Sequence, residues 1–163
     1  MLSQTTEYAL RAMACLAYAP DELTPTPRLA EQTLVPPNYL AKVLQSLAQA
    51  DLITGRRGVG GGYRLARPAD EITLLDVVNA IDPVSPIEQC PLGLKSHSSD
   101  LCALHRCVDK AARQFIDSFK GIKLSDLIAE SGGERLRPLC ETTDPGVVPA
   151  TIDGQGDPSA TTP

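Results

Sequence analysis

Residues 29–67 read LAEQTLVPPNYLAKVLQSLAQADLITGRRGVGGGYRLAR, and most of the expected architecture follows from them. Apolar residues recur at helical spacing as far as about Ala50, except at VPP (35–37), because proline has no N–H to donate inside a helix. The break predicts a short helix ending near Thr33 and a second helix from Pro37 to about Ala50. The stripe expected to be buried in the second helix is Leu40, Val43, Leu44 and Leu47.

The outer face of the second predicted helix is polar and carries no acidic residue. Two short helices joined by a tight break are typical of a helix-turn-helix, although many helical hairpins share this layout. The second helix of such a unit enters the major groove, where amide and ammonium groups can hydrogen-bond to base edges. The candidate DNA contacts on it are Asn38, Tyr39, Lys42 and Gln45. For Tyr39, packing or a hydrogen bond to phosphate is the alternative.

A glycine-rich turn follows this helix. Short strands are predicted at Leu52–Thr54 and Tyr63–Ala66, and the glycines at 58, 60, 61 and 62 permit positive φ and keep the tip slim. The basic residues around the tip, which can enter a groove or lie along phosphates, are Arg56, Arg57 and Arg64. A nucleotide-binding loop fits poorly because it opens a helix, whereas a strand follows here. A plain hairpin turn remains the alternative.

Local signals predict two helices before the break at VPP. Ser3 is a candidate N-cap for a first helix that runs to about Tyr18. Thr24–Pro27 offers a threonine cap and a proline in the first turn for the helix that ends near Thr33.

Local signals also predict three helices after the glycine-rich turn. Thr73 and Asp76 make a capping-box pattern for a helix through Ile81. A long amphipathic helix to about Phe119 and a short one at Leu124–Glu130 follow. The expected fold class is therefore mainly α with a small β-hairpin wing, that is, a winged helix-turn-helix followed by a long helix.

The long predicted helix carries an apolar stripe of Leu104, Val108, Ala111, Phe115 and Phe119. A compact winged unit leaves little for so long a stripe to pack against except a second copy, so we expect a homodimer. The predicted organisation is a DNA-binding domain at 1–82, a cysteine-containing loop at 83–102, a dimerisation helix and closing helix at 103–130, and a disordered tail at 131–163.

Charge is uneven along the chain, whose net charge is −5. Residues 23–67 hold six basic side chains, Arg28 among them, against two acidic ones, whereas residues 71–130 hold six against nine. A basic segment in an acidic protein indicates a local anion-binding face, and Arg28 joins the candidate DNA contacts. Ordinary solvated surface charge is the alternative.

Residues 90–107 read CPLGLKSHSSDLCALHRC and hold three of the five cysteines and both histidines. The odd number of cysteines and the lack of a signal peptide indicate a cytosolic protein, where clustered cysteines favour metal or redox chemistry over disulfides. No apolar run reaches the roughly 18 residues of a membrane span. Zinc, a thiol sensor without a cluster, and simple burial of the cysteines are the alternatives.

Helix geometry restricts this cysteine segment. At about 100° per residue, Cys102 and Cys107 would point about 140° apart if both lay well inside one helix. Cys102 is therefore expected in the loop or the first turn, and Ser98, Ser99 and Asp100 are suitable N-caps for that placement.

Four stretches carry a resemblance to a known family: TEYALRAMACLA (5–16), the segment 29–53, RGVGGGYRLAR (57–67) and ITLLDVVNAID (72–82). In this order they resemble the Rrf-type winged-helix transcription regulators, the IscR- and NsrR-like bacterial repressors. The resemblance implies a dimer that binds double-stranded DNA at a near-palindromic operator. Several members hold an iron–sulfur cluster through three cysteines before the dimer helix, and others have no cluster.

The resemblance also implies a set of cluster ligands. Cys90, Cys102 and Cys107 stand where the cluster cysteines of such regulators stand, although the spacing C-x11-C-x4-C is wider and less even than theirs. Three thiolates leave one site for another donor. Glu7 occupies the place of a carboxylate that the partner subunit supplies in some relatives. A surface glutamate favoured by the helix dipole is its alternative role, and His97 and His105 are rival donors.

The leading functional hypothesis is a repressor whose DNA affinity depends on a redox-sensitive iron–sulfur or metal centre. An enzyme is not predicted, because the sequence has no acid/base carboxylate motif, Ser/His/Asp set or phosphate loop. The alternatives are a regulator without a cluster, a metal-dependent redox protein that reuses a winged domain, and a winged domain used for protein contacts.

Overall fold

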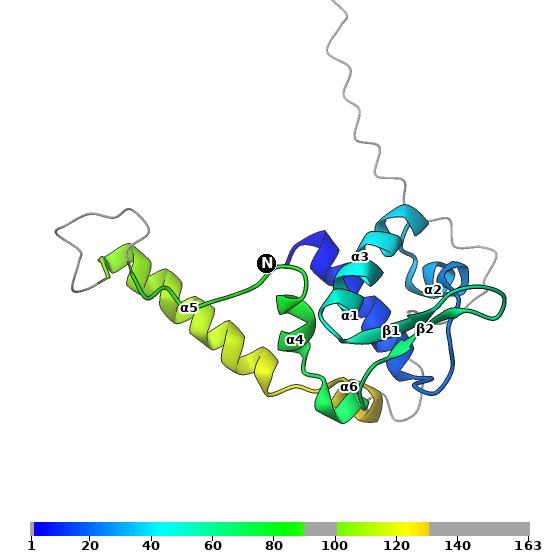
Figure 1. Ribbon diagram of the computed structural model, residues 1–163. Helices are drawn as coiled ribbons and strands as arrows, with labels where there is room; N and C mark the ends of the chain where they lie inside the picture. Colours follow the sequence, from blue (N-terminus) through cyan, green and yellow to red (C-terminus); the bar gives the residue numbers. More distant parts are fainter. Residues whose placement is uncertain (1, 90–100, 131–163) are drawn as a thin grey trace, which may run out of the picture.

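A computed structural model describes residues 2–89 and 101–130 as a mostly helical chain with one two-stranded hairpin (Figure 1). The elements are α1 (Gln4–Ala17), α2 (Thr26–Thr33), α3 (Pro37–Gln49), β1 (Ile53–Arg56), β2 (Gly62–Leu65), the 3-10 helix η1 (Ala69–Glu71), α4 (Leu74–Asn79), α5 (Ala103–Lys120) and α6 (Leu124–Glu130). The predicted fold class is confirmed. Most helix ends lie within one residue of the expected positions, but α4 ends at Asn79 rather than Ile81.

Helix α1 lies at the centre of the molecule and contacts α2, α3, α4, α6 and β2. Ala9, Ala12, Met13 and Leu16 on it are fully buried, and the two alanines let neighbouring helices approach closely. Its N-terminus begins as predicted, because the Ser3 hydroxyl accepts a hydrogen bond from the Thr6 N–H at 3.2 Å.

The helix-turn-helix consists of α2 and α3, which pack on α1. Leu34 ends α2 in the left-handed conformation, with φ of 54°, and the predicted stripe of α3 is buried. The predicted threonine cap of α2 is wrong. Pro25 is the N-cap and no side chain caps the helix. Thr24 instead pairs through its backbone with Tyr63 of β2, with N···O distances of 2.8 and 2.9 Å.

The hairpin pairs β1 with β2 antiparallel, and Arg56 lies opposite Gly62. Each end of the two strands differs from its predicted position by one or two residues. Of the four glycines that permit positive φ here, Gly58 and Gly60 adopt it, whereas Gly61 and Gly62 do not. A Cβ on Gly62 would lie 2.5 Å from the backbone of Thr24, so this glycine is needed for close approach and not for its φ.

The C-terminal part of the described chain returns to the core. The capping box of Thr73 and Asp76 is present, as predicted. Leu124 at the start of α6 is fully buried, and its N–H donates to the Ile72 carbonyl at 3.0 Å. In contrast, α5 extends away from the compact body on the side opposite the hairpin, and none of its residues is buried (Figure 1).

Several predictions concern residues outside the described ranges, namely those for Cys90, His97 and the tail at 131–163. Within the described ranges no helix is long and apolar enough to cross a membrane.

Candidate DNA-binding surface and cysteine site

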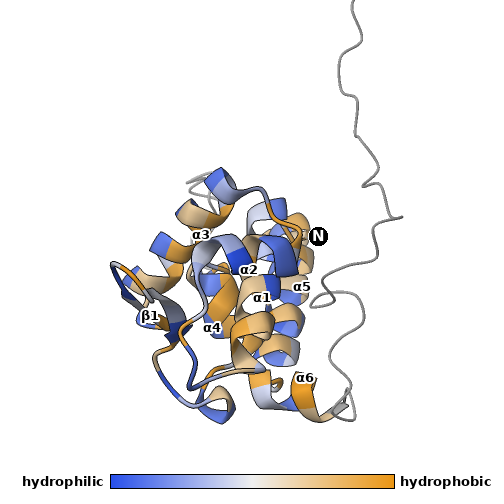
Figure 2. Ribbon diagram, turned by 90° about the vertical axis from the view of Figure 1, so that its right-hand side faces the viewer, coloured by the Kyte–Doolittle hydropathy of each residue, from blue (hydrophilic) through white to orange (hydrophobic). Residues whose placement is uncertain are grey.

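The outer face of α3 presents the side chains that the sequence singled out. Asn38, Tyr39, Lys42 and Gln45 are all exposed, whereas the apolar stripe predicted for this helix is buried. Hydrophilic and hydrophobic segments accordingly follow one another along the ribbon of α3 (Figure 2). Tyr39 is 56% exposed and its ring meets Tyr8 of α1 edge-on, with centroids 6.4 Å apart. Tyr39 therefore has a packing contact as well as a free surface.

The wing presents the predicted arginines to solvent. Arg56, Arg57 and Arg64 are exposed, and Val59 at the tip is fully exposed. The Thr24–Tyr63 backbone pairing joins the wing to the segment that leads into α2. Because both hydrogen bonds are between backbone groups, the wing is held in one place relative to the helix-turn-helix.

A groove of about 570 Å³ lies between the wing and the helix-turn-helix. Its walls come from the start of α2, from Ala48 of α3 and from the wing around Arg56 and Arg57. Within residues 2–89 and 101–130 the ion pairs are Glu7–Arg11 and Asp109–Arg113, so no described carboxylate neutralises the wing arginines. Unpaired cations beside an exposed polar helix suit the phosphate backbone of DNA.

Residues 2–130 match the profile of Rrf2, described as iron-dependent transcriptional regulators. The chain belongs to the Rrf2 family. Like the other Rrf2 proteins it is a DNA-binding transcription regulator and not an enzyme.

Solved structures share the Rrf2 fold of this chain. CymR (YrzC), the global cysteine regulator of B. subtilis, is 23% identical with a TM-score of 0.66, over 80% of this chain and 97% of that one. T. potens IscR is 21% identical with a TM-score of 0.66, over 80% and 88%. The oxidized form of Staphylococcus aureus CymR is 25% identical with a TM-score of 0.62, over 78% and 94%.

The described part of the cysteine segment lies at the start of α5 of this Rrf2 protein. Cys102 is the N-cap of α5, which confirms its predicted place in the loop or the first turn. The expectation that Ser98, Ser99 or Asp100 caps this helix is wrong. The Sγ of Cys102 lies 3.3 Å from Nδ1 of His105, and Cys107, five residues after Cys102, is exposed. Cys15, in contrast, is buried in α1.

Glu7 is not brought to these cysteines within one chain. It lies exposed in the first turn of α1, where its Oε1 accepts from Nε of Arg11 at 3.1 Å. Within residues 2–89 and 101–130 no three His, Cys, Asp or Glu side chains form a cluster suited to a metal ion. The contact between the Cys102 thiol and the His105 imidazole, together with the exposed thiol of Cys107, nevertheless suits a centre with sulfur ligands, provided that further donors come from Cys90 and from a second chain.

A junction at Asp82, missed by sequence reasoning, holds the segment that leads to the cysteines. Thr6 is fully buried, and its hydroxyl donates to Asp82 Oδ2 at 2.7 Å. The Ser3 hydroxyl donates to the same oxygen. These bonds lower the pKa of Asp82, Ser3 first and Thr6 second. Contacts between residues more than 70 positions apart leave no spacing signal in a sequence.

Two further bonds continue the junction. The Val84 N–H donates to the Asn79 side chain at 3.0 Å, and the Ile87 N–H donates to Asp109 of α5 at 2.9 Å. The path from α4 towards the cysteines is therefore tied to α1, α4 and α5 in turn.

Replacing Asp82 with alanine is expected to lower the free energy of unfolding by about 1–2 kcal/mol, at the low end for bonds to a charged group because Asp82 is exposed. The folded-state pKa lies below the ordinary 3.8, so the contribution is present above that pH and is lost as pH falls through the folded value. Urea unfolding at pH 7 and below pH 3.8 measures both effects. Asp70→Ala, an exposed aspartate in η1, is the control, and equal losses in the two variants would contradict the junction.

Proposed function

We propose that this Rrf2 protein is a homodimeric repressor that binds a near-palindromic operator and whose affinity depends on an iron–sulfur or other redox-sensitive metal centre. Residues 1–82 read DNA, 83–102 contribute the cysteine loop, and 103–130 dimerise. The observation that carries the proposal is the groove shared by the wing, α2 and α3, with exposed arginines beside an exposed polar helix. Asn38, Lys42 and Gln45 are proposed to contact bases, and Arg28, Tyr39, Arg56, Arg57 and Arg64 the backbone.

The experiment that tests DNA reading is an operator titration of Arg57→Ala and Arg64→Ala at several salt concentrations. Each variant should bind all sequences more weakly and show a salt slope flatter by about one unit, because each lost phosphate contact releases about one counterion fewer. Lys110→Ala is the matched control, an exposed cation on α5. Unchanged slopes in both arginine variants would remove the wing from the DNA.

The exposed stripe on α5 supports the dimer. Leu104 and Val108 are 67% and 46% exposed, and the rings of Phe115 and Phe119 stack with centroids 4.2 Å apart. Phe119 also packs against the core of its own chain. An apolar helix face left in water is unfavourable, and a second α5 packed along it would bury it in both chains.

The proposed centre is held by Cys90, Cys102, Cys107 and a fourth donor, Glu7 of the second chain. The thiol of Cys102, its contact with His105 and the exposure of Cys107 support it. When bound, such a centre would supply a link between chains that depends on oxidation state. His97 and His105 are the rivals for the fourth donor, and His105 already contacts Cys102.

A chain of contacts connects Glu7 to the recognition helix. Glu7 holds Arg11, the Arg11 guanidinium lies 6.0 Å from the centre of the Tyr8 ring, and Tyr8 meets Tyr39 of α3 edge-on. If Glu7 is engaged elsewhere, Arg11 loses its carboxylate partner and the Tyr8 contact is free to change. This route would couple the state of the centre to the position of α3.

A further inference from the structure

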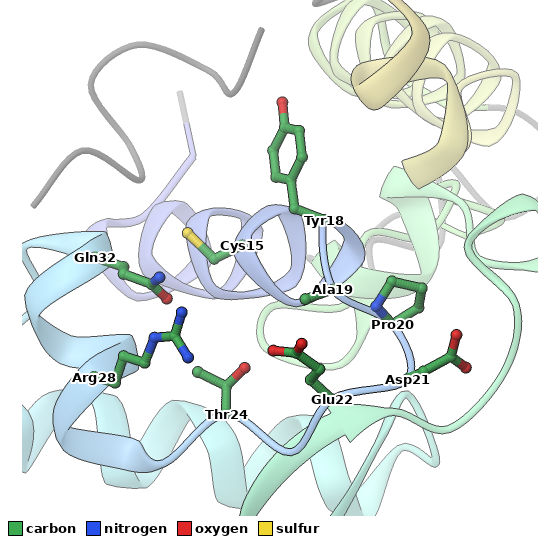
Figure 3. Close-up of a pocket in the computed structure, with 9 residues that line it drawn as sticks. All are labelled: Cys15, Tyr18, Ala19, Pro20, Asp21, Glu22, Thr24, Arg28 and Gln32. Carbon is green, nitrogen blue, oxygen red and sulfur yellow. The ribbon is translucent and has the colours of Figure 1, made fainter. Parts of the chain in front are cut away.

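A polar cavity of about 410 Å³ lies behind the helix-turn-helix, between the C-terminal half of α1, the loop 18–24 and α2 (Figure 3). Its volume is within the range of ligand sites, roughly 300–1,000 Å³. It is distinct from the groove beside the wing and from the cysteine segment. Among its lining residues, only Arg28 has a place in the proposed DNA contacts.

Two oppositely charged side chains face each other across this cavity without forming an ion pair. The Arg28 guanidinium from α2 and the Glu22 carboxylate from the loop point into the same space (Figure 3). Neither side chain belongs to the ion pairs of the described residues. Gln32 lies one turn beyond Arg28 on the same face of α2 and also lines the space.

The charge pattern selects the kind of ligand. A simple anion inside the cavity would meet Arg28 but would be repelled by Glu22 and by Asp21, the residue before it in the loop. A simple cation would be attracted by the carboxylates but repelled by Arg28. A small molecule with a carboxylate and an ammonium group satisfies both, because a guanidinium binds a carboxylate through two parallel hydrogen bonds and Glu22 can accept from the ammonium.

We propose that this cavity binds a free α-amino acid with a small side chain, its carboxylate on Arg28 and Gln32 and its ammonium on Glu22. Buried Cys15 of α1 and buried Thr24 at the end of the loop line two sides of the cavity, which limits the size of the ligand's side chain. The site lies within the reading head itself, since α2 is the first helix of the helix-turn-helix.

The site also predicts an effect on DNA binding, which rests on the proposed phosphate contact of Arg28. A guanidinium held by the ligand's carboxylate is withdrawn from the phosphate, so the amino acid should weaken operator binding. By linkage, operator DNA should weaken binding of the amino acid by the same factor.

Calorimetry of the full chain without DNA tests the site, with L-alanine, L-serine and L-cysteine as probes and with propionate and ethylamine as probes that keep one charge each. At least one amino acid should bind saturably, and propionate and ethylamine should bind about tenfold more weakly or not at all. Arg28→Gln and Glu22→Gln should each weaken the amino acid about tenfold or more, whereas Arg64→Gln should leave its binding unchanged.

Three outcomes would overturn the site: no binding by any of the three amino acids, propionate binding as well as they do, or binding that survives both cavity substitutions. Operator titration of the same protein separates this result from the proposed function. A chain that binds its operator but none of the amino acids retains the function and loses the site.

Discussion

Replacing Gly62 with alanine is expected to lower the free energy of unfolding by about 2–4 kcal/mol. It should also weaken operator binding more than Arg57→Ala or Arg64→Ala does. The added Cβ would lie 2.5 Å from the carbonyl carbon and oxygen of Thr24 and 2.8 Å from the nitrogen of Pro25. These are backbone atoms, so β2 and the segment before α2 must separate. Both hydrogen bonds of the Thr24–Tyr63 pair then weaken together.

Two other glycines provide controls for the Gly62 experiment. Gly60→Asn should change stability by less than about 1 kcal/mol, because its φ of 71° is one that asparagine tolerates and nothing lies within 4 Å of the added Cβ. Gly121→Ala at the end of α5 should be close to neutral, since its nearest neighbour is 3.6 Å away. Urea unfolding and operator titration measure both quantities. A Gly62→Ala protein as stable as these controls would show that the wing does not depend on its contact with Thr24.

Replacing Cys102 or Cys107 with serine is expected to abolish the visible absorption, the iron and the acid-labile sulfide of anaerobically purified protein. Thiolates are the usual ligands of iron–sulfur clusters, and a serine hydroxyl is a poor substitute for one. Cys90→Ser should act in the same way. Cys15→Ser is the control, because Cys15 is buried in α1 away from the segment at the start of α5 and its loss should leave the absorption intact.

The same spectra distinguish the candidates for the fourth donor. Glu7→Gln should shift the spectrum and weaken the control of DNA affinity, while His105→Gln should change neither. The reverse pattern would assign the fourth position to His105, which lies 3.3 Å from the Cys102 sulfur. A parent protein that stays colourless and free of iron after anaerobic reconstitution would contradict the cluster and favour a regulator that works without one.

The Gly62 and cysteine experiments both concern how a signal at the cysteines could reach the DNA. The wing is held through Thr24, α3 is contacted through Tyr39, and the path to the cysteines is tied to α1 through Asp82. Helix α1 contributes to the last two and packs on β2, the strand that carries the Thr24 pairing. A change at the cysteine segment is therefore expected to act through α1, and Asp82→Ala should weaken the coupling as well as the fold.

The sequence by itself determined the elements whose signals are local. Proline at 36 and 37 separates α2 from α3, the apolar spacing of α3 identifies its buried face, and Thr73 with Asp76 starts α4. Each signal depends on residues within a turn or two of one another, so hydrogen bonding and side-chain periodicity are enough to read it. Membership of the family could be recognised for the same reason, since its motifs are contiguous stretches.

Only the tertiary structure decided which distant groups meet. Gly62 has an ordinary φ, and its importance depends on the backbone of Thr24, a neighbour that no periodicity reveals. Asp82 reads as an exposed aspartate until Ser3 and Thr6 are placed against it. Arg28 belongs to α2 and Glu22 to the loop before it. The two side chains face each other across one cavity because of the way α2 packs on α1. Such contacts form when whole helices and strands pack together. A local pattern of residues therefore does not reveal which distant pairs will meet.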